Sequence, residues 1–471
     1  MSTFSGLNTA YRGLSAAKAG IDVAGQNIAN SRTEGYTRQR LNTSAIGGPS
    51  MAGKFSVGVR PGGGVNIDGI ARLGDMHLDA RVRASAAVSG FSAVRAGVFS
   101  GLESALHEPG PNGISTQLQS FWASWQELSN SPGEATQSGL LLQQSQVLAQ
   151  QISSTYTEFD NQWTQVRGEV RDLTAELNGA AAQLADLNGR IRQATASGGS
   201  VNELLDQRSL LATTIATIAG GTIRDAGDGT IDVYIGGNAL VTGTTARTVN
   251  VIGSNTMAGS DTSPVTLEWA HRPGSAISLD GGELAGAVST LAPAAAGGGI
   301  AKAAESLNNF AQKLADAVNT VHRTGVSADG STNLEFFAFT AGKPAAQGLT
   351  VVPTSAAGIA TAGPGQGALD GSIADAISQL GTGAGSPDSV WSSFVVELGI
   401  ATRSENRQAD LAALATTSAV GMQLANASVD IDEENVSLLM YQHAYQGAAR
   451  VMTAVDEMLD VLINRTGLVG R

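Results

Sequence analysis

The sequence contains no cysteine, and this absence excludes several kinds of chemistry. A chain without thiols forms no disulfide, carries no thiolate nucleophile and offers no zinc–thiolate site. Basic residues are also scarce, since 28 of them against 41 acidic residues give a net charge of −13. That balance disfavours nucleic acid and anionic membranes as main partners. No apolar run reaches the roughly 18 residues that a membrane-spanning helix needs. We therefore expect no nucleic-acid partner and no membrane insertion.

Motifs for catalysis or cofactor binding are missing as well. The five histidines form no HExxH motif, so each is expected on the surface or on a helix face rather than as a metal ligand. Gly342-Lys343 lacks the glycine spacing and the following Ser or Thr of a phosphate loop. The acidic run at 430–434 is explained by the start of a helix more simply than by a cation site. We predict that the protein is not an enzyme and that it binds no cofactor and no metal.

The first residues, MSTFSGLNTAYRG, differ from a secretion signal. They have neither the basic n-region nor the apolar h-region of a Sec signal peptide. If the protein is exported, we expect another machine to export it.

What the chain does have is a regular heptad pattern near its end. The apolar positions step by 3 and 4 residues without interruption: Leu438, Tyr441, Tyr445, Ala448, Met452, Val455, Leu459 and Leu462. This spacing places all of these side chains on one face of a helix. Asp430 and Glu433 just before it have the spacing of a capping box. A single apolar seam is marginal in water, so the pattern predicts a partner helix.

The same stepping occurs at the beginning of the chain: Phe4, Leu7, Tyr11, Leu14, Lys18, Ile21, Gly25 and Ile28. Ala10, Ala17 and Ala24 lie beside this seam and allow a helix to approach closely. We interpret the two seams as one coiled coil made from both ends of the chain. The alternative is two separate amphipathic helices packed on one core.

The residues after the first helix carry a resemblance. Asn27-Ile28-Ala29-Asn30 followed by Thr33, Gly35-Tyr36-Thr37-Arg38 and Gln39 resembles the amino-terminal signature of bacterial flagellar rod, hook and hook-associated proteins. The Tyr-Thr-Arg-Gln variant is most similar to the hook-associated protein 1 family. The run Leu204-Leu205-Asp206-Gln207-Arg208 resembles the same family, as do stretches near Gly113–Pro132 and Ala317–His322. The motif residues that we carry over are Asn27, Asn30, Gly35, Tyr36, Arg38, Leu205, Asp206 and Arg208.

The periodicity predicts an α+β fold with nested, discontinuous domains. Residues 1–35 with 428–471 form the terminal coiled coil. Residues 36–220 with 290–325 and 391–427 form a bundle of long helices, including one from about 134 to 195, with a short β arm at 41–70. Residues 221–289 with 326–390 form a small β-rich outer domain, the second part packing on the first. Trp122 and Trp125 are expected in the core of the bundle.

The resemblance implies a structural subunit of the extracellular flagellum that joins hook to filament. It implies export through the flagellar type III apparatus and a chaperone that holds the carboxyl-terminal helix. It also implies three kinds of assembly contact: with further copies of the chain in a ring, with the hook protein, and with a neighbouring junction protein on the filament side. The predicted assembly interface consists of the apolar seam residues Phe4, Leu7, Tyr11, Leu14, Ile21, Ile28, Leu438, Tyr441, Tyr445, Met452, Val455, Leu459 and Leu462.

Two other hypotheses stay open at this point. One is a hook or rod subunit of the same axial class, which the long helices at 75–218 disfavour. The other is an enzyme or small-ligand binder on a helical scaffold, which no motif supports.

Overall fold

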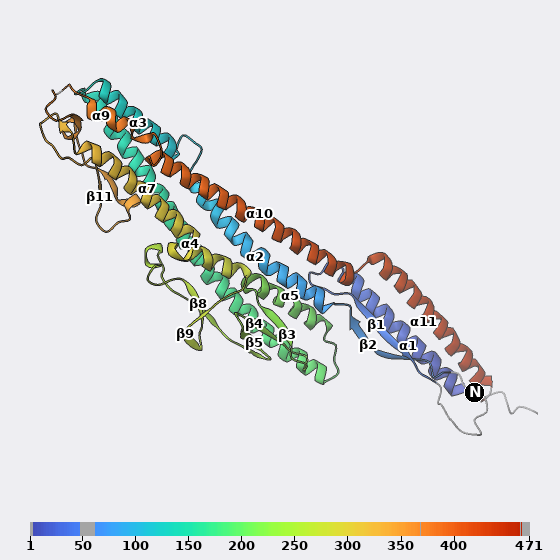
Figure 1. The fold of residues 1–471 in the computed structure, drawn as a ribbon. Helices are drawn as coiled ribbons and strands as arrows, with labels where there is room; N and C mark the ends of the chain where they lie inside the picture. Colours follow the sequence, from blue (N-terminus) through green and yellow to red (C-terminus); the bar gives the residue numbers. More distant parts are fainter. Residues whose placement is uncertain (1–2, 48–61, 368, 462, 464–471) are drawn as a thin grey trace, which may run out of the picture.

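The computed structural model describes residues 3–47, 62–367, 369–461 and 463. The molecule is long and mostly helical, with the first and last helices at one end and a bundle extending away from them (Figure 1). The main helices are α1 (Thr3–Ala29), α2 (Met76–Ala105), α3 (Ile114–Asn130), α4 (Ala135–Ala196), α5 (Asn202–Ala219), α6 (Gly282–Leu291), α7 (Gly299–His322), α10 (Pro387–Ala427) and α11 (Ile431–Asp460). Two short helices are α8 (Ala345–Gly348) and α9 (Ser372–Ser378). The α+β class is confirmed.

The bundle forms where the sequence predicts it. Helix α2 begins at Asp75, whose side chain accepts hydrogen bonds from the N–H groups of His77 and Leu78. Helix α10 begins after Ser386, which caps it, with Pro387 in the first turn. The core is aromatic and aliphatic, and its largest fully buried side chains include Trp125, Trp163, Trp391, Phe121, Phe159 and Phe310. The prediction that Trp122 and Trp125 lie in the core is confirmed.

Helix α4 is the rod on which the rest of the bundle is arranged. Its 62 residues span about 93 Å at 1.5 Å per residue. A first β unit packs on its carboxyl-terminal half, where Asn178 bonds the backbone of Val249 and Asn188 bonds the backbone of Ile231. This unit has one sheet of β3 (Thr222–Asp225), β4 (Ile231–Ile235), β5 (Asn238–Thr242) and β6 (Thr245–Ala246), and a second of β7 (Val249–Ile252), β8 (Thr266–Trp269) and β9 (Arg272–Ile277). All of these strands pair antiparallel.

The prediction that residues 326–390 pack on this β unit is wrong. Their strands are β10 (Val326–Ser327), β11 (Phe337–Phe339), β12 (Leu349–Val351) and β13 (Ala360–Ala362), which form two separate pairs, β10–β13 and β11–β12. They lie at the far end of the bundle (Figure 1), where Gln347 accepts a hydrogen bond from Ser153 of α4. Ser153 and Asn178 are about 37 Å apart along the helix. The rigid rod therefore keeps the two β segments apart. The rest of the predicted domain division stays a prediction.

The predicted β arm is a two-stranded antiparallel ribbon within the described residues. Strand β1 (Gln39–Ala45) pairs with β2 (Val65–Arg72), and the register shifts between Asn42 and Thr43. The ribbon lies along α1 (Figure 1). Residues 48–61 of the predicted arm at 41–70 lie outside the described residues.

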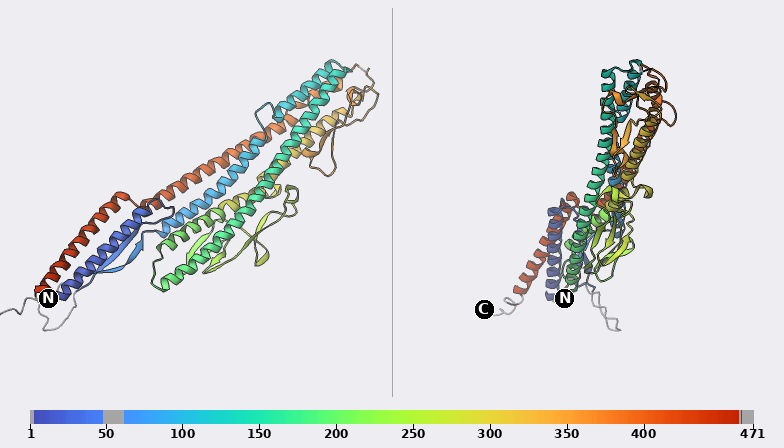
Figure 2. Two further views of the ribbon diagram at one scale, coloured as in Figure 1. Left: turned by 180° about the vertical axis from the view of Figure 1, so that it is seen from behind. Right: turned by 90° about the vertical axis from the view of Figure 1, so that its left-hand side faces the viewer.

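The two terminal helices lie side by side, as predicted, and both outer ends are at the same end of the molecule (Figure 2). They run antiparallel, because Gly6 of α1 faces Val455 of α11, Gly13 faces Ala448 and Gly20 faces Tyr441. In α11 the predicted seam is the covered face: Val455 is buried, and Leu438, Tyr441, Ala448, Met452 and Leu459 are half-buried. Tyr445 is exposed, and Leu462 lies outside the described residues.

In α1 the predicted seam is not the face that meets α11. Phe4 is 68% exposed and Tyr11 60% exposed, and Leu7, Leu14, Ile21 and Ile28 are only half-buried. Three glycines of α1 face α11, namely Gly6, Gly13 and Gly20, and the alanines that continue their step of 4 and 3, Ala10, Ala17 and Ala24, are buried. Small side chains let the backbones of α1 and α11 approach closely. The packing gained in this way exceeds what the larger apolar face of Phe4 and Tyr11 would contribute by burial. The predicted heptad spacing in α1 matches the structure, but the residues that face α11 precede the predicted ones by one position, as Gly6 precedes Leu7 and Gly13 precedes Leu14.

His322 lies on a buried face at the end of α7, whereas the prediction allowed either the surface or a helix face. It is fully buried at the end of α7, where its Nδ1 donates to the carbonyl of Leu334 at 2.8 Å and its Nε2 accepts from the N–H of Ala360 at 2.9 Å. These two partners fix one neutral tautomer. Burial lowers the pKa of His322 below its usual 6.5. One turn earlier, Asn319 holds the backbone of Phe336 and Phe337, so the end of α7 organises residues 326–362.

We expect acid to destabilise this end of the bundle through His322. The unfolded chain takes up a proton as the pH falls through about 6.5, whereas the folded chain resists protonation until a lower pH. The free energy of unfolding should therefore fall by up to about 1.4 kcal/mol per pH unit below pH 6.5. Urea unfolding between pH 7.5 and 5.5 measures this slope. His322→Asn should flatten it and the exposed-site variant His77→Gln should not; an unchanged slope in His322→Asn would contradict the assignment.

Two glycines of α1 provide a matched test of the helix pair. A Cβ at Gly20 would meet the Tyr441 ring well inside van der Waals contact, whereas a Cβ at Gly25 meets nothing within 4 Å. Gly20→Ala should loosen the pair by about 1–3 kcal/mol despite its better helix propensity. Gly25→Ala should stabilise α1 by about 1 kcal/mol. Hydrogen exchange of the α1 amides reads both effects, and equal stabilisation by the two variants would show that Gly20 does not face α11.

Candidate functional site at the junction of the terminal helices and the bundle

The loop that leaves α1 is closed by Asn27. The buried Asn27 side chain donates to the carbonyl of Gln39 at 2.8 Å and accepts from the Gln39 N–H at 3.0 Å and from the Tyr36 hydroxyl at 2.8 Å. Gly35 turns the loop with φ of +75°, a conformation that L side chains rarely adopt. Three of the predicted motif residues, Asn27, Gly35 and Tyr36, therefore shape a single turn that feeds β1.

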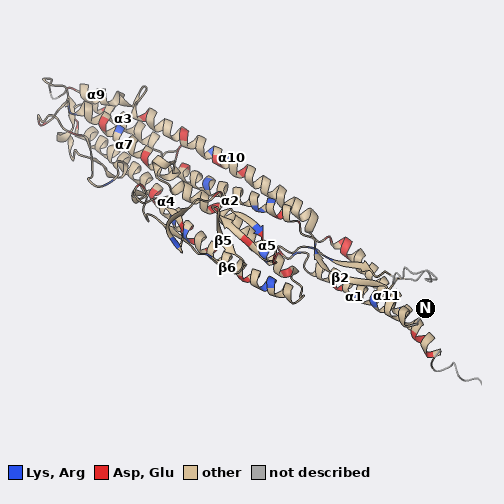
Figure 3. Cartoon of the chain, turned by 60° about the horizontal axis from the view of Figure 1, so that its bottom comes forward, with Lys and Arg blue, Asp and Glu red and all other residues tan. Residues whose placement is uncertain are grey.

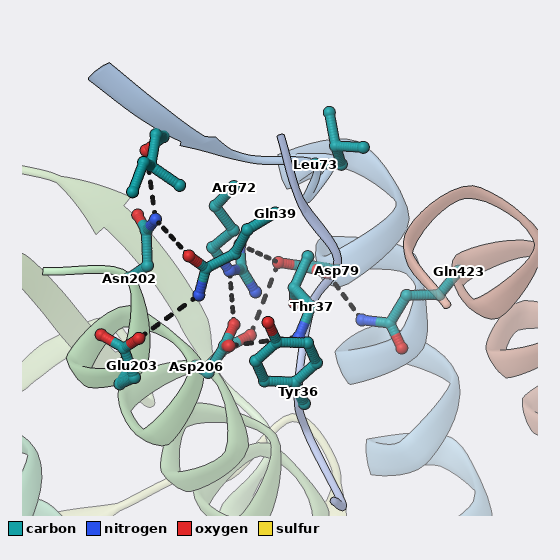
Figure 4. A network of polar contacts seen from close by, with 12 residues as sticks. Tyr36, Thr37, Gln39, Arg72, Leu73, Asp79, Asn202, Glu203, Asp206 and Gln423 are labelled. Carbon is teal, nitrogen blue, oxygen red and sulfur yellow. Dashed lines mark hydrogen bonds and ion pairs between the residues drawn. The ribbon is translucent and has the colours of Figure 1, made fainter. Parts of the chain in front are cut away.

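Asp206 of α5 joins this turn to the bundle (Figure 4). One carboxylate oxygen accepts from the N–H of Thr37 at 3.1 Å, and the other accepts from Nε of Arg72 at 2.6 Å. Arg72 lies within 4.0 Å of Asp79 in α2, and Asp79 in turn accepts from Gln423 of α10 at 2.6 Å. One chain of polar contacts thus crosses α5, the motif loop, β2, α2 and α10.

A second branch holds the β ribbon to α5. Asn202 donates to the Gln39 side chain and to the carbonyl of Ile70, both at 3.1 Å. Gln39 also donates to Glu203 at 3.4 Å. Both strands of the ribbon are therefore fixed to the first turn of α5 (Figure 4).

Arg38 fixes the corner between α10 and α11. Its guanidinium pairs with Glu434 at 2.7 Å and with Glu433 at 2.9 Å, and its N–H donates to the carbonyl of Ala427, the last residue of α10. The hydrogen bond to Glu433, followed by the bond and charge of Glu434, raises the pKa of Arg38. Asp430 caps α11 by accepting from the N–H groups of Asp432 and Glu433, which confirms its predicted role at the helix start. The acidic run thus has a second role, as the partner of Arg38, that the sequence did not reveal.

The titration of Tyr36 favours a structural role for the junction, in which its hydroxyl keeps its proton, over a role in proton transfer. Burial, with the nearby negative charges of Asp206, Glu203 and Glu434, raises the pKa of Tyr36 to about 12. Tyr36 therefore stays protonated and continues to donate to Asn27 at physiological pH. Charged residues of both signs occur along α2, α4, α5 and α10 (Figure 3). Among the described residues no group of three or more histidine or acidic side chains could hold a metal ion.

A cleft of about 440 Å³ lies beside the network. The motif loop forms one wall, with Gly35, Tyr36 and Thr37. Apolar side chains also line it, namely Val82 of α2, Leu210 of α5 and Leu424 of α10.

Within the described residues, each helix is too short or too polar to span a membrane.

The remaining motif residues have other roles. The Asn30 side chain bonds locally, donating to the carbonyl of Gln26 and accepting from the hydroxyl of Thr33. Leu205 is half-buried beside Asp206. Arg208 points away from the junction, and it donates to Asn188 of α4 at 3.2 Å and to the carbonyl of Gly229 at 2.7 Å. Arg208 therefore holds the first β unit, and burial lowers its pKa.

Sequence reasoning missed half of the network. Arg72, Asp79, Asn202, Gln423 and Glu434 were not among the predicted site residues. Their partners lie up to 396 residues away along the chain, so no local spacing connects them. No local pattern in the sequence distinguishes Asp79 within α2 or Gln423 within α10 from other polar helix residues.

Asp206 offers a direct test of the junction. Asp206→Ala removes the acceptor of the Thr37 N–H and leaves Arg72 with only the longer contact to Asp79. We expect a loss of about 3 kcal/mol in unfolding free energy, because breaking a largely buried pair strands the other charge. Asp186→Ala is the control, since its pair with Arg190 on the same bundle is exposed and should cost less than about 0.5 kcal/mol. Equal losses in the two variants, measured by urea unfolding, would contradict the role of the network.

Comparisons with known proteins agree with the motif. The family model described as the flagellar hook-associated protein FlgK helical domain matches residues 99–337. The model described as the flagellar basal body rod FlgEFG protein C-terminal matches residues 424–465. The flagellar hook-associated protein 1 of Bacillus subtilis (strain 168) is 30% identical over 507 aligned positions, which cover 100% of both chains.

More distant relatives match part of the chain. The flagellar hook-associated protein 1 of Escherichia coli (strain K12) is 28% identical over 72% of this chain and 60% of its own length. The solved structure of the flagellar hook junction protein FlgK from Burkholderia pseudomallei has the same fold over 74% of this chain and 99% of its own, with a TM-score of 0.60 and 15% identity. The helical-domain match and the full-length relative place the chain in a family: it belongs to the flagellar hook-associated protein 1 family.

Proposed function

We propose that this chain is a structural subunit that joins the flagellar hook to the filament and assembles through its terminal helices. Family membership supports a flagellar role, and the relative of known structure is called a hook junction protein. The observation that carries the proposal is the apolar outer surface of the terminal pair. Phe4 and Tyr11 of α1 are exposed, together with Val436, Met440, Val451 and Met458 of α11.

This surface is costly in an isolated molecule. Side chains such as Phe4 and Met458 lose favourable burial of apolar area, worth about 1.5–3 kcal/mol each, as long as they face water. Copies stacked side by side would cover them. The predicted seam of Phe4, Leu7, Tyr11, Leu14, Ile21 and Ile28 then becomes a contact between subunits rather than a contact within one chain.

The remaining partners follow from the same proposal. Further copies of this chain form a ring, the hook protein lies on one side, and another junction protein lies on the filament side. Export uses the flagellar type III apparatus, and a chaperone covers the carboxyl-terminal helix before assembly. The acidic, cysteine-free composition is compatible with threading an unfolded chain through a channel.

A hook or rod subunit is the second candidate, because the match at 424–465 is to a segment of rod-type proteins. The longer match to the hook-associated helical domain favours the junction role. Gene deletion separates the two: loss of a junction protein leaves hooks without filaments, whereas loss of a rod or hook subunit leaves no hook.

The exposed face of α1 gives a sharper test. Cells that express Phe4→Ser with Tyr11→Ser in place of the natural protein should export it but carry mostly bare hooks in electron micrographs. Val88→Ser is the control, since Val88 is also exposed but lies on α2, away from the terminal pair. Normal filaments in the double variant would refute assembly through this face.

A further inference from the structure

A groove lies between α4 and strand β7, away from the junction and the terminal helices. It has a volume of about 620 Å³. One end is closed by Asn178, which donates to the carbonyl of Val249 at 2.8 Å and accepts from its N–H at 2.9 Å. Nearer the other end Arg167 bridges the groove, because its Nε donates to the carbonyl of Ser254 at 3.2 Å, and Thr164 and Asn255 line the groove beyond it. The eleven steps from Arg167 to Asn178 along α4 and the five steps from Val249 to Ser254 along the extended chain each span about 16 Å. Because Asn178 meets Val249 and Arg167 meets Ser254, the helix and the strand run in opposite directions.

Strand β7 presents an open edge to this groove. Its sheet has the order β7–β8–β9, so β7 is an edge strand. Both backbone polar groups of Val249 point to α4, and in an antiparallel pair such groups alternate between the two sides. The even-numbered residues face β8, since Thr248 accepts from Ala270 and Ser254 donates to Ser263. The N–H and C=O of Val251 therefore face the groove, between the Asn178 and Arg167 bridges.

The groove widens from Val249 toward Ser254. A short asparagine side chain spans the gap at the first end, and a long arginine side chain spans it at the second. An open strand edge beside such a space is the arrangement that accepts an extra extended segment.

The helical wall of the groove is basic in an acidic protein. Arg167 and Arg171 lie one turn apart and both line it. In the part of the chain that the structure describes, Arg167 forms no ion pair, and burial followed by the charge of Arg171 lowers its pKa. Arg171 has Asp172 at 3.3 Å, but both side chains of that pair are about three-quarters exposed, so the pair is weak. Two arginines without a strong partner favour a carboxylate-bearing ligand.

We propose that this groove binds a short, extended, acidic segment of a partner protein. The segment adds to the edge of β7 by pairing its backbone with Val251, and its carboxylates pair with Arg167 and Arg171. The roughly 16 Å between the Asn178 and Arg167 bridges accommodates about five extended residues. The site is separate from the contacts that the terminal helices provide, and the inference does not depend on the proposed place in the flagellum.

The test uses the full chain and a fluorescein-labelled, capped pentapeptide that alternates glutamate and valine. Fluorescence anisotropy should show saturable binding, and the lysine–valine analogue should bind at least about tenfold more weakly. Arg167→Gln with Arg171→Gln should also weaken binding at least about tenfold, since two charge-assisted hydrogen bonds are lost. The matched control is Arg190→Gln with Arg192→Gln, two exposed arginines of α4 outside the groove, which should leave the affinity unchanged.

Three results would overturn the proposal. The first is the absence of binding, or equal affinity in the two double variants. The second is unchanged affinity for a peptide whose backbone is N-methylated, because strand addition needs those N–H groups; this arm uses the natural chain and does not depend on the variants folding. The third is a dimer in analytical ultracentrifugation that the Arg167→Gln, Arg171→Gln variant dissolves, which would make a second copy of this chain the occupant.

Discussion

The close approach of α1 and α11 is the contact on which the organisation of this molecule depends. Gly6, Gly13 and Gly20 face Val455, Ala448 and Tyr441, so one antiparallel register holds along the pair. Glycines inside a helix cost about 1 kcal/mol each relative to alanine, and a seam of glycine and alanine buries little apolar area. The pair is therefore weak for its length. Helix α1 uses its small face for this internal contact, and its large apolar residues Phe4 and Tyr11 remain exposed, where the proposed assembly would cover them.

The polar network at the junction connects the terminal helix pair to the bundle. Asn27 shapes the turn after α1, Asp206 fixes that turn to α5, and Arg38 fixes the corner where α10 becomes α11. Both helices of the terminal pair are thus attached to the same bundle through largely buried, hydrogen-bonded charges. Such networks are costly to break in part, because each lost partner leaves a buried charge behind. The network therefore fixes the orientation of α1 and α11 relative to the bundle, even though the packing between the two helices is weak.

The sequence predicted the long helices because their period and breakers are local. The limits of α2, α3, α4 and α5 follow from Asp75, the Pro109–Gly113 break, Pro132-Gly133 and the glycines near 198 and 220. Predictions from the sequence failed where the structure depends on contacts between residues that are far apart along the chain. The heptad count in α1 chose Phe4 and Tyr11 because they are large and apolar, whereas close approach to α11 selected Gly13 and Ala17. The position of 326–390 depended on the length of α4. The Arg72–Asp206 and Asp79–Gln423 contacts join residues that are 134 and 344 positions apart, so no local pattern predicts them.

Engineered disulfides test the register of the terminal pair most directly, since the chain has no cysteine of its own. A Cβ at Gly13 would lie 3.8 Å from the Cβ of Ala448, a separation that suits a disulfide. Gly13→Cys with Ala448→Cys should oxidise rapidly to a cross-link within one chain. Tyr11→Cys with Ala448→Cys, which uses the exposed face of α1, should not. A cross-link from Tyr11 with none from Gly13 would show that the large apolar seam, and not the small one, holds the two ends of the chain together.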